Sequence, residues 1–163
     1  KPGKAGRGAE GKQAVAVAVE TVAPRGMGRV RIEVVQNCGS AALGAFLQNN
    51  IEQETTIITD KWPAYTAAAL KGFIHKAVES TKNALSCVHI VISLFKRWLL
   101  GTHQAGTSPK YLQNYADEFV FRFNRRKSKN RLKVFARLLE QAASTPATTY
   151  RDITGDKGKE RQT

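Results

Sequence analysis

The chain has 163 residues, enough for one ordinary domain that buries about two thirds of the surface its unfolded form exposes. Lysine and arginine number 26 against 13 acidic residues, so the formal net charge is +13 and nucleic acid is the leading class of partner. No stretch reaches the roughly 18 uninterrupted apolar residues of a membrane span, and no apolar signal core follows the N-terminal charges. The composition therefore argues against membrane proteins and exported proteins.

The first segment is predicted to be a flexible basic arm. Residues 1–12 hold four basic residues, four glycines and a proline, which build no packed face. The sequence contains one methionine, Met27, and does not start with it, so we expect a fragment of a longer protein. Its two cysteines, Cys38 and Cys87, lack metal-ligand spacing and are expected to be small apolar residues in a reducing compartment.

Strands and helices alternate in the first half of the chain. Residues 13–22 and 29–36 alternate in the manner of strands, and the PRGMG turn between them predicts a hairpin. Ser40 caps a predicted helix that runs to Asn49. Further predicted elements are a strand over 55–59, an alanine-rich helix over 65–70 and a strand over 73–78. This order predicts an α/β fold.

The second half is predicted to be helical. From Leu85 to a terminating Gly101, an apolar stripe recurs at the helical period, while a neighbouring face carries polar residues. The stripe consists of Val88, Ile92, Phe95 and Leu99, and the polar face of His89, Ser93 and Lys96. Ser108 and Pro109 begin the next helix, whose stripe is Leu112, Tyr115, Phe119 and Phe123. A last helix covers 132–143, and residues 144–163 form a loose polar tail.

Basic residues are concentrated in these helices. Between Leu85 and Glu140 there are eleven lysines and arginines against three acids. A solvated helix face usually mixes both signs, so this excess favours a surface for nucleic-acid phosphates over charge that serves solubility alone. The densest part is Arg122, Arg125, Arg126 and Lys127, three of which carry the planar guanidinium group that suits phosphate oxygens.

Asp60 is the best candidate for chemistry. A carboxylate where a strand ends can present its oxygens to a metal ion, although an aspartate before a tight turn also serves as a cap. His75 and His103 are expected to be surface or packing histidines. For His89, a buried core position and a place on the polar face both stay open.

Three motifs in this order resemble a known family. They are TDKWPAY at 59–65, VHIVISLFKRWLLGTHQ at 88–104 and SPKYLQNYADEFVFRFNRR at 108–126. Together they resemble the catalytic domain of bacterial insertion-sequence transposases of the DDE class, in the ISXO-type subgroup. The KPGKAGRGAEGKQAVAVAVE and GRVRIEVV segments extend the resemblance, which runs from Lys1 to about Ala143. It implies a cytoplasmic, DNA-associated bacterial protein that binds element ends and target DNA, with a homo-oligomer on DNA as one arrangement.

The resemblance implies an RNase H-like fold, a mixed sheet with helices, followed by C-terminal helices. In such a domain, two divalent ions (Mg²⁺ or Mn²⁺) activate water or a DNA 3′-hydroxyl for attack on a phosphodiester. The family pattern puts the second catalytic acid at Asp60, the third metal ligand at His89 and an accessory polar group at Asn124. It also makes Lys96 and Arg97 DNA contacts, together with the Arg122, Arg125, Arg126 and Lys127 group.

Two departures from the family pattern limit what we expect of the chain. The family's first acid lies in a VDET-like strand, and no aspartate precedes Asp60 here. We therefore expect a catalytic domain over 13–143 that lacks its first strand and does not perform strand transfer alone. Histidine replaces glutamate at His89, which suits manganese better than magnesium.

Two alternatives to the transposase fragment stay open. The first is a DNA-binding module without metal chemistry. The second is an RNA-associated protein, which the helical core stripe through Tyr115, Phe119 and Phe123 disfavours because its aromatic rings would be buried.

Overall fold

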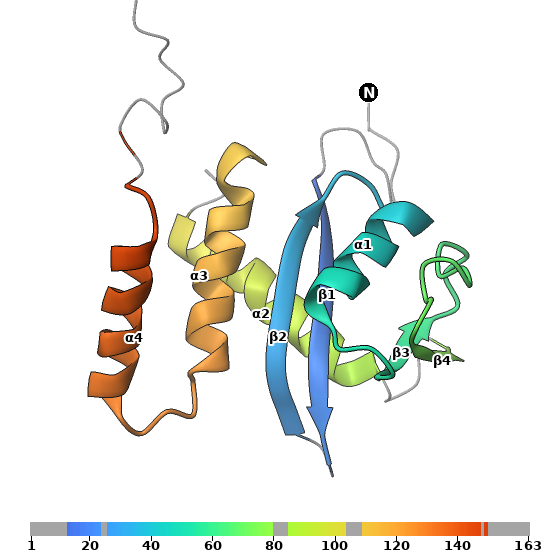
Figure 1. The fold of residues 1–163 in the computed structure, drawn as a ribbon, viewed down its shortest axis with the longest axis horizontal. Coiled ribbons are helices and arrows are strands. Elements are labelled where there is room, and N and C mark those ends of the chain that lie inside the picture. Colours follow the sequence, from blue (N-terminus) through green and yellow to red (C-terminus); the bar gives the residue numbers. More distant parts are fainter. Residues whose placement is uncertain (1–12, 24–25, 80–84, 104–108, 148, 150–163) are drawn as a thin grey trace, which may run out of the picture. The chain divides into compact units, whose positions relative to one another are not determined.

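The structure is a computed structural model that describes residues 13–23, 26–79, 85–103, 109–147 and 149 (Figure 1). The expected arm over 1–12, Ser108 and most of the polar tail lie outside these residues. The chain divides into two compact units, Lys1–Arg126 and Lys127–Thr163. In the described residues, the first unit holds every strand together with α1, α2 and α3, and the second holds α4.

The predicted hairpin is present. Strand β1 (Ala14–Val22) pairs antiparallel with β2 (Gly26–Val35), with an irregularity between Val19 and Thr21. The two faces of β1 pack into different cores. Its alanines at 14, 16 and 18 join one hydrophobic cluster, and its valines at 15, 17 and 19 join the other. The alternation of small and branched residues therefore places β1 between two layers of helix.

Helix α1 (Ser40–Asn50) packs on the alanine face of the hairpin. Phe46 and Leu47 are buried there in a cluster with Ala16, Val35, Ile57 and Leu70. Gly39 is the N-cap and makes no side-chain cap bond, so the expected cap by Ser40 is wrong. The Ser40 hydroxyl instead lies 2.5 Å from that of Thr66, which ties the start of α1 to the turn that follows Asp60.

A second small sheet follows α1. Strand β3 (Thr56–Asp60) pairs in parallel with β4 (Ile74–Val78). The bounds of both strands agree within one residue with the ranges predicted from sequence, 55–59 and 73–78. The alanine-rich helix predicted over 65–70 is wrong, because that segment forms turns. A single helix-type bond joins Leu70 N–H to the Thr66 carbonyl, and a segment this short cannot offset the entropic cost of nucleating a helix.

Helices α2 (Ser86–His103) and α3 (Leu112–Asn124) pack on the valine face of the hairpin, and a 3₁₀ turn (Pro109–Tyr111) leads into α3. The buried members of this cluster are Val30, Ile32, Val91, Phe95, Ala116, Phe119 and Phe123. Of the stripe predicted for α2 only Phe95 is buried, and Val91, which lies outside that stripe, is the most deeply buried residue of the helix. The predicted end at Gly101 is also wrong, since α2 continues to His103, whose ring packs against Trp98 and Tyr115.

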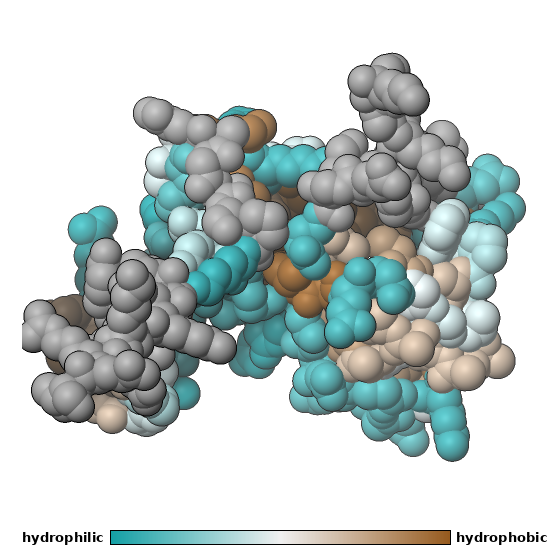
Figure 2. Space-filling model, turned by 90° about the horizontal axis from the view of Figure 1, so that it is seen from above, coloured by the Kyte–Doolittle hydropathy of each residue, from teal (hydrophilic) through white to brown (hydrophobic). Residues whose placement is uncertain are grey.

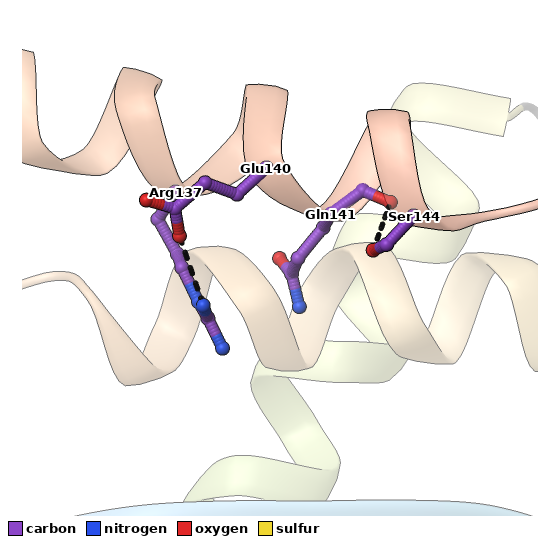
Figure 3. Close-up of polar contacts among 4 residues, drawn as sticks. All are labelled: Arg137, Glu140, Gln141 and Ser144. Carbon is purple, nitrogen blue, oxygen red and sulfur yellow. Dashed lines mark hydrogen bonds and ion pairs between the residues drawn. The ribbon is translucent and has the colours of Figure 1, made fainter.

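Helix α4 (Arg131–Ser144) is the regular element among the described residues of the second unit, and it extends the predicted helix by one residue at each end. Asn130 caps it by accepting a bond from Lys133 N–H at 3.0 Å. Its polar face carries the Arg137–Glu140 ion pair and a bond from the Ser144 hydroxyl to the Gln141 carbonyl (Figure 3). Large apolar residues elsewhere on α4 are exposed, namely Leu132, Phe135, Leu138 and Leu139.

The predicted α/β class is thus confirmed, with two two-stranded sheets rather than one mixed sheet in the described part of the chain. Among the residues that Figure 2 colours, hydrophilic ones (teal) border an area of hydrophobic ones (brown to tan). Among the described residues, no helix is both long enough and apolar enough to cross a bilayer.

Candidate functional site

Asp60 is the last residue of β3, opposite Val78 of β4, and its side chain is partly buried. The hydroxyl of the buried Thr59 donates a hydrogen bond to the Asp60 carbonyl at 2.8 Å. His75 Nε2 of β4 lies 2.8 Å from the same hydroxyl oxygen. Because a hydroxyl has one proton, Nε2–H must donate to Thr59 Oγ1 when that hydroxyl donates to the carbonyl. A hydrogen-bond chain from His75 through Thr59 therefore holds the backbone at Asp60.

His89 lies in the first turns of α2 and is exposed, as are Ser93 and Lys96. Of the two readings left open by the sequence, the structure supports the polar face. The sequence predicted that these three residues share one face, because residues three and four apart lie on the same side of a helix. His89 is therefore not a core histidine.

Asn124, at the end of α3, binds the outer edge of β2. Its Oδ1 accepts from Val30 N–H at 2.8 Å, and its Nδ2 donates to the Val30 carbonyl at 3.1 Å. Farther along β2, the side-chain amide of Gln113 also binds the strand's backbone. Its Oε1 accepts from Val34 N–H at 2.7 Å, and its Nε2 donates to the Ile32 carbonyl at 3.4 Å. The two amides replace a neighbouring strand and cover an edge that would otherwise expose backbone groups.

The three predicted site residues thus lie on three different parts of the first unit. Asp60 ends β3, His89 lies on α2 and Asn124 is bound to β2. Within the part of the chain that the structure describes, no group of three or more His, Cys, Asp or Glu side chains could hold a metal ion. A carboxylate suits Mg²⁺ or Mn²⁺, but such ions need several oxygen ligands. The described residues therefore do not fit a complete metal site.

Two of the predicted DNA contacts, Arg125 and Arg126, bind backbone carbonyls and aromatic rings of the protein itself. The guanidinium of Arg126 stacks on Phe123 at 3.9 Å and donates to the carbonyls of Met27 and Gly28. Arg125 stacks on Phe121 at 3.7 Å and donates to its carbonyl at 3.3 Å. These two arginines therefore stabilise the end of α3 as well as carrying charge.

Four further predicted DNA contacts are exposed. Arg122 pairs with Glu118 at 3.3 Å, while Lys96, Arg97 and Lys127 make no described ion pair. Exposed surface pairs are weak, so Arg122 can exchange Glu118 for a phosphate at little cost. DNA contact by Lys96, Arg97, Arg122 and Lys127 stays a prediction.

The family model of the ISXO2-like transposase domain matches residues 1–124, about three quarters of the sequence. The chain belongs to this transposase family. The predicted resemblance to a DDE-type insertion-sequence transposase is thereby confirmed, and DNA is the partner that the family implies. Transposases of the DDE class generally use divalent metal ions. No curated protein and no solved structure matched the chain.

The matched residues include Asp60, His89 and Asn124 and end just before Arg125. Helix α4 lies beyond the match. Sequence reasoning missed the roles of Thr59 and Gln113, which depend on partners 16 and 79 residues away. The role of Thr59 could have been inferred from sequence. Thr59 lies two residues from Ile57 and so on the same, inward face of the strand, and a buried hydroxyl needs a hydrogen-bond partner.

Proposed function

We propose that the chain is part of the catalytic domain of a DDE transposase, in which it binds DNA and supplies the acid at Asp60. The observation that carries the proposal is the family match over 1–124, with Asp60 at the carboxyl end of β3 inside it. The intact domain would cut DNA at element ends and join it to a target by metal-dependent phosphoryl transfer. A net charge of +13 agrees with a DNA-binding role.

The RNase H-like fold belongs to the same proposal. Ala16 of β1 and Ile57 of β3 lie in one hydrophobic cluster beneath α1. Among the described residues, however, β1 pairs only with β2, and β3 only with β4. A further strand between β1 and β3 would join the antiparallel and parallel pairs into one mixed sheet, with Asp60 next to its central strand. That arrangement is the expected RNase H-like sheet.

Asp60 would give such a site one carboxylate, and when bound, the metal ions would activate the attacking oxygen and neutralise the leaving one. Thr59 and His75 hold the Asp60 backbone. Because the described residues offer no complete ligand set, we do not expect this chain alone to cleave or join DNA. Its own activity in the proposal is binding.

A fluorescence-anisotropy titration with duplex DNA tests the binding. We expect the affinity to fall steeply as salt rises, with log K declining linearly against log salt, because each neutralised phosphate releases counterions. Binding that is indifferent to salt between 50 and 200 mM, a range over which several phosphate contacts cost about a thousandfold, would contradict the proposal.

The second candidate is a DNA-binding module that does no metal chemistry in any context, which the absence of a three-ligand cluster among described residues favours. A nicking assay on supercoiled DNA with Mn²⁺ separates the two when it is run on a chain extended N-terminally to include the expected first strand. Cleavage by the extended chain that disappears in Asp60→Asn supports the transposase catalytic domain. No cleavage by the extended chain supports the binding module.

A further inference from the structure

Helix α4 has an exposed apolar face. None of its residues is buried, and its four large apolar side chains are 49 to 80 % exposed. Leu132, Phe135, Leu139 and Ala142 recur three and four residues apart, so they lie on one side of the helix. The polar residues at 133, 137, 140, 141 and 144 recur in the same way on the other side, and Figure 3 draws four of them.

The size of this face indicates a binding surface. Leu132, Phe135, Leu138 and Leu139 fall within about two helical turns. Four large apolar side chains so close together form a patch on the order of a few hundred Å², which monomeric soluble proteins seldom expose without a binding role. A stable protein interface buries about 800 Å² on each partner. The face of α4 is smaller, so it fits a weak and reversible contact.

The spacing of the apolar residues fits a second helix. Intervals of three, four and three residues separate Leu132, Phe135, Leu139 and Ala142. These intervals are those of the core positions along which two helices pack lengthwise. Leu138 and the alanines at 136 and 143 border the same row, which widens the apolar contact. The partner that matches this face is therefore an amphipathic helix.

The charges at the two ends of α4 indicate which helix that is. Its first turn contains no acid but holds Arg131 and Lys133, and its last turn contains no basic residue. Both ends are the reverse of what the helix dipole favours. An antiparallel copy of α4 would place its C-terminal carbonyls and Glu140 near the basic first turn, and the same contact would form at the other end. A parallel copy would bring like charges together.

We propose that α4 is a self-association surface through which two copies of this chain pair with their α4 helices antiparallel. Phe135 of each copy would lie against Leu139 of the other, and Leu132 against Ala142, so that each large side chain meets a smaller one. The inference goes beyond the proposed function, because α4 lies outside the residues 1–124 that match the family model and the pairing needs no DNA.

Sedimentation of the full chain without DNA tests the association. The concentration should run from about 2 µM to about 200 µM, because an interface of this size binds weakly. The weight-average mass of wild type should rise from 17.9 kDa, the mass of one copy, toward twice that value. Leu139→Lys should raise the dissociation constant at least about tenfold, because it would bury an unpaired charge in the contact.

Gln141→Lys is the matched control, since it adds the same charge on the polar side of α4 (Figure 3). It should associate like wild type. Leu139 and Gln141 are both exposed, so circular dichroism spectra and melting curves of the two variants should overlay those of wild type.

Cysteine cross-linking tests the orientation of the helices, in a background with Cys38 and Cys87 changed to alanine. A mixture of the Leu132→Cys and Ala142→Cys chains should form a disulfide-linked pair, because the antiparallel arrangement brings these two positions within disulfide distance. Neither variant alone should link to itself efficiently. In a parallel pair each position would face its own copy, and each variant would link alone.

Three results would overturn the inference. Wild type could keep the mass of one copy at about 200 µM, a concentration at which a weak contact is populated. Leu139→Lys could associate as strongly as wild type, which would place the contact elsewhere on the chain. Self-linking of both cysteine variants would show a parallel pair. Loss of DNA binding by wild type would contradict the proposed function and leave these three measurements unaffected.

Discussion

Asn124 shows how a single residue can satisfy a sequence motif and yet have a local structural role. Both polar atoms of its amide bond to Val30, 94 residues away. We expect Asn124→Ala to lower the free energy of unfolding by about 2 kcal/mol, because the N–H and carbonyl of the buried Val30 lose their partners. Urea denaturation followed by circular dichroism measures this. Asn114→Ala, at an exposed position of the same helix, should be nearly neutral, and equal midpoints for the two variants would show that the amide does not hold the edge.

Thr59 offers a second test at the level of one side chain. Thr59→Val keeps the shape and removes the hydroxyl that joins His75 Nε2 to the Asp60 carbonyl. The loss should cost about 1–2 kcal/mol of unfolding free energy, since two polar groups are left unpaired. Thr59→Ser keeps a hydroxyl and should recover most of that loss in the same thermal melts. A valine variant as stable as wild type would mean that the hydrogen-bond chain does not stabilise β3.

Helix α4 has no buried residues, so its stability depends mainly on interactions within its own segment, such as the N-terminal cap. Asn130 accepts from Lys133 N–H, and a lost asparagine cap typically costs about 1 kcal/mol. Asn130→Ala should therefore accelerate hydrogen exchange of the α4 amides about fivefold, as NMR would record. Gln141→Ala, on the polar face of α4, should leave exchange unchanged or slow it, because alanine favours helix. Equal exchange in Asn130→Ala and wild type would exclude a capping role.

The elements predicted from sequence were those with a long, regular pattern. The alternation of Ala and Val in β1 and the stripe of α3 identified elements whose faces are in fact buried. The helix expected over 65–70 failed because alanine propensity does not stabilise one short turn beside a proline. In α2, sequence alone could not choose between neighbouring apolar positions, since the contact with α3 and the hairpin decides that Val91 is the deepest. The role of Asn124 could not be predicted for a similar reason, because its partner, Val30 of β2, lies 94 residues away in the sequence.

Across the whole molecule, positive charge extends beyond the part that matches the family. Both hydrophobic clusters lie entirely before Arg126. The unit Lys127–Thr163 carries nine lysines and arginines against four acids. Its segment just before and within α4 contains Lys127, Lys129, Arg131, Lys133 and Arg137. The catalytic candidate and a large share of the positive charge thus lie in different units.

We therefore expect a chain ending at Arg126 to fold cooperatively yet bind duplex DNA on the order of tenfold more weakly at low salt, because it loses phosphate-neutralising charge. Anisotropy titrations at several salt concentrations should also show a shallower slope. A full-length variant with Lys127, Lys129 and Arg131 changed to glutamine separates charge from the presence of α4, and it should reproduce much of the loss. If the shortened chain binds with full affinity and slope, the second unit contributes no contacts and DNA is held by the first unit alone.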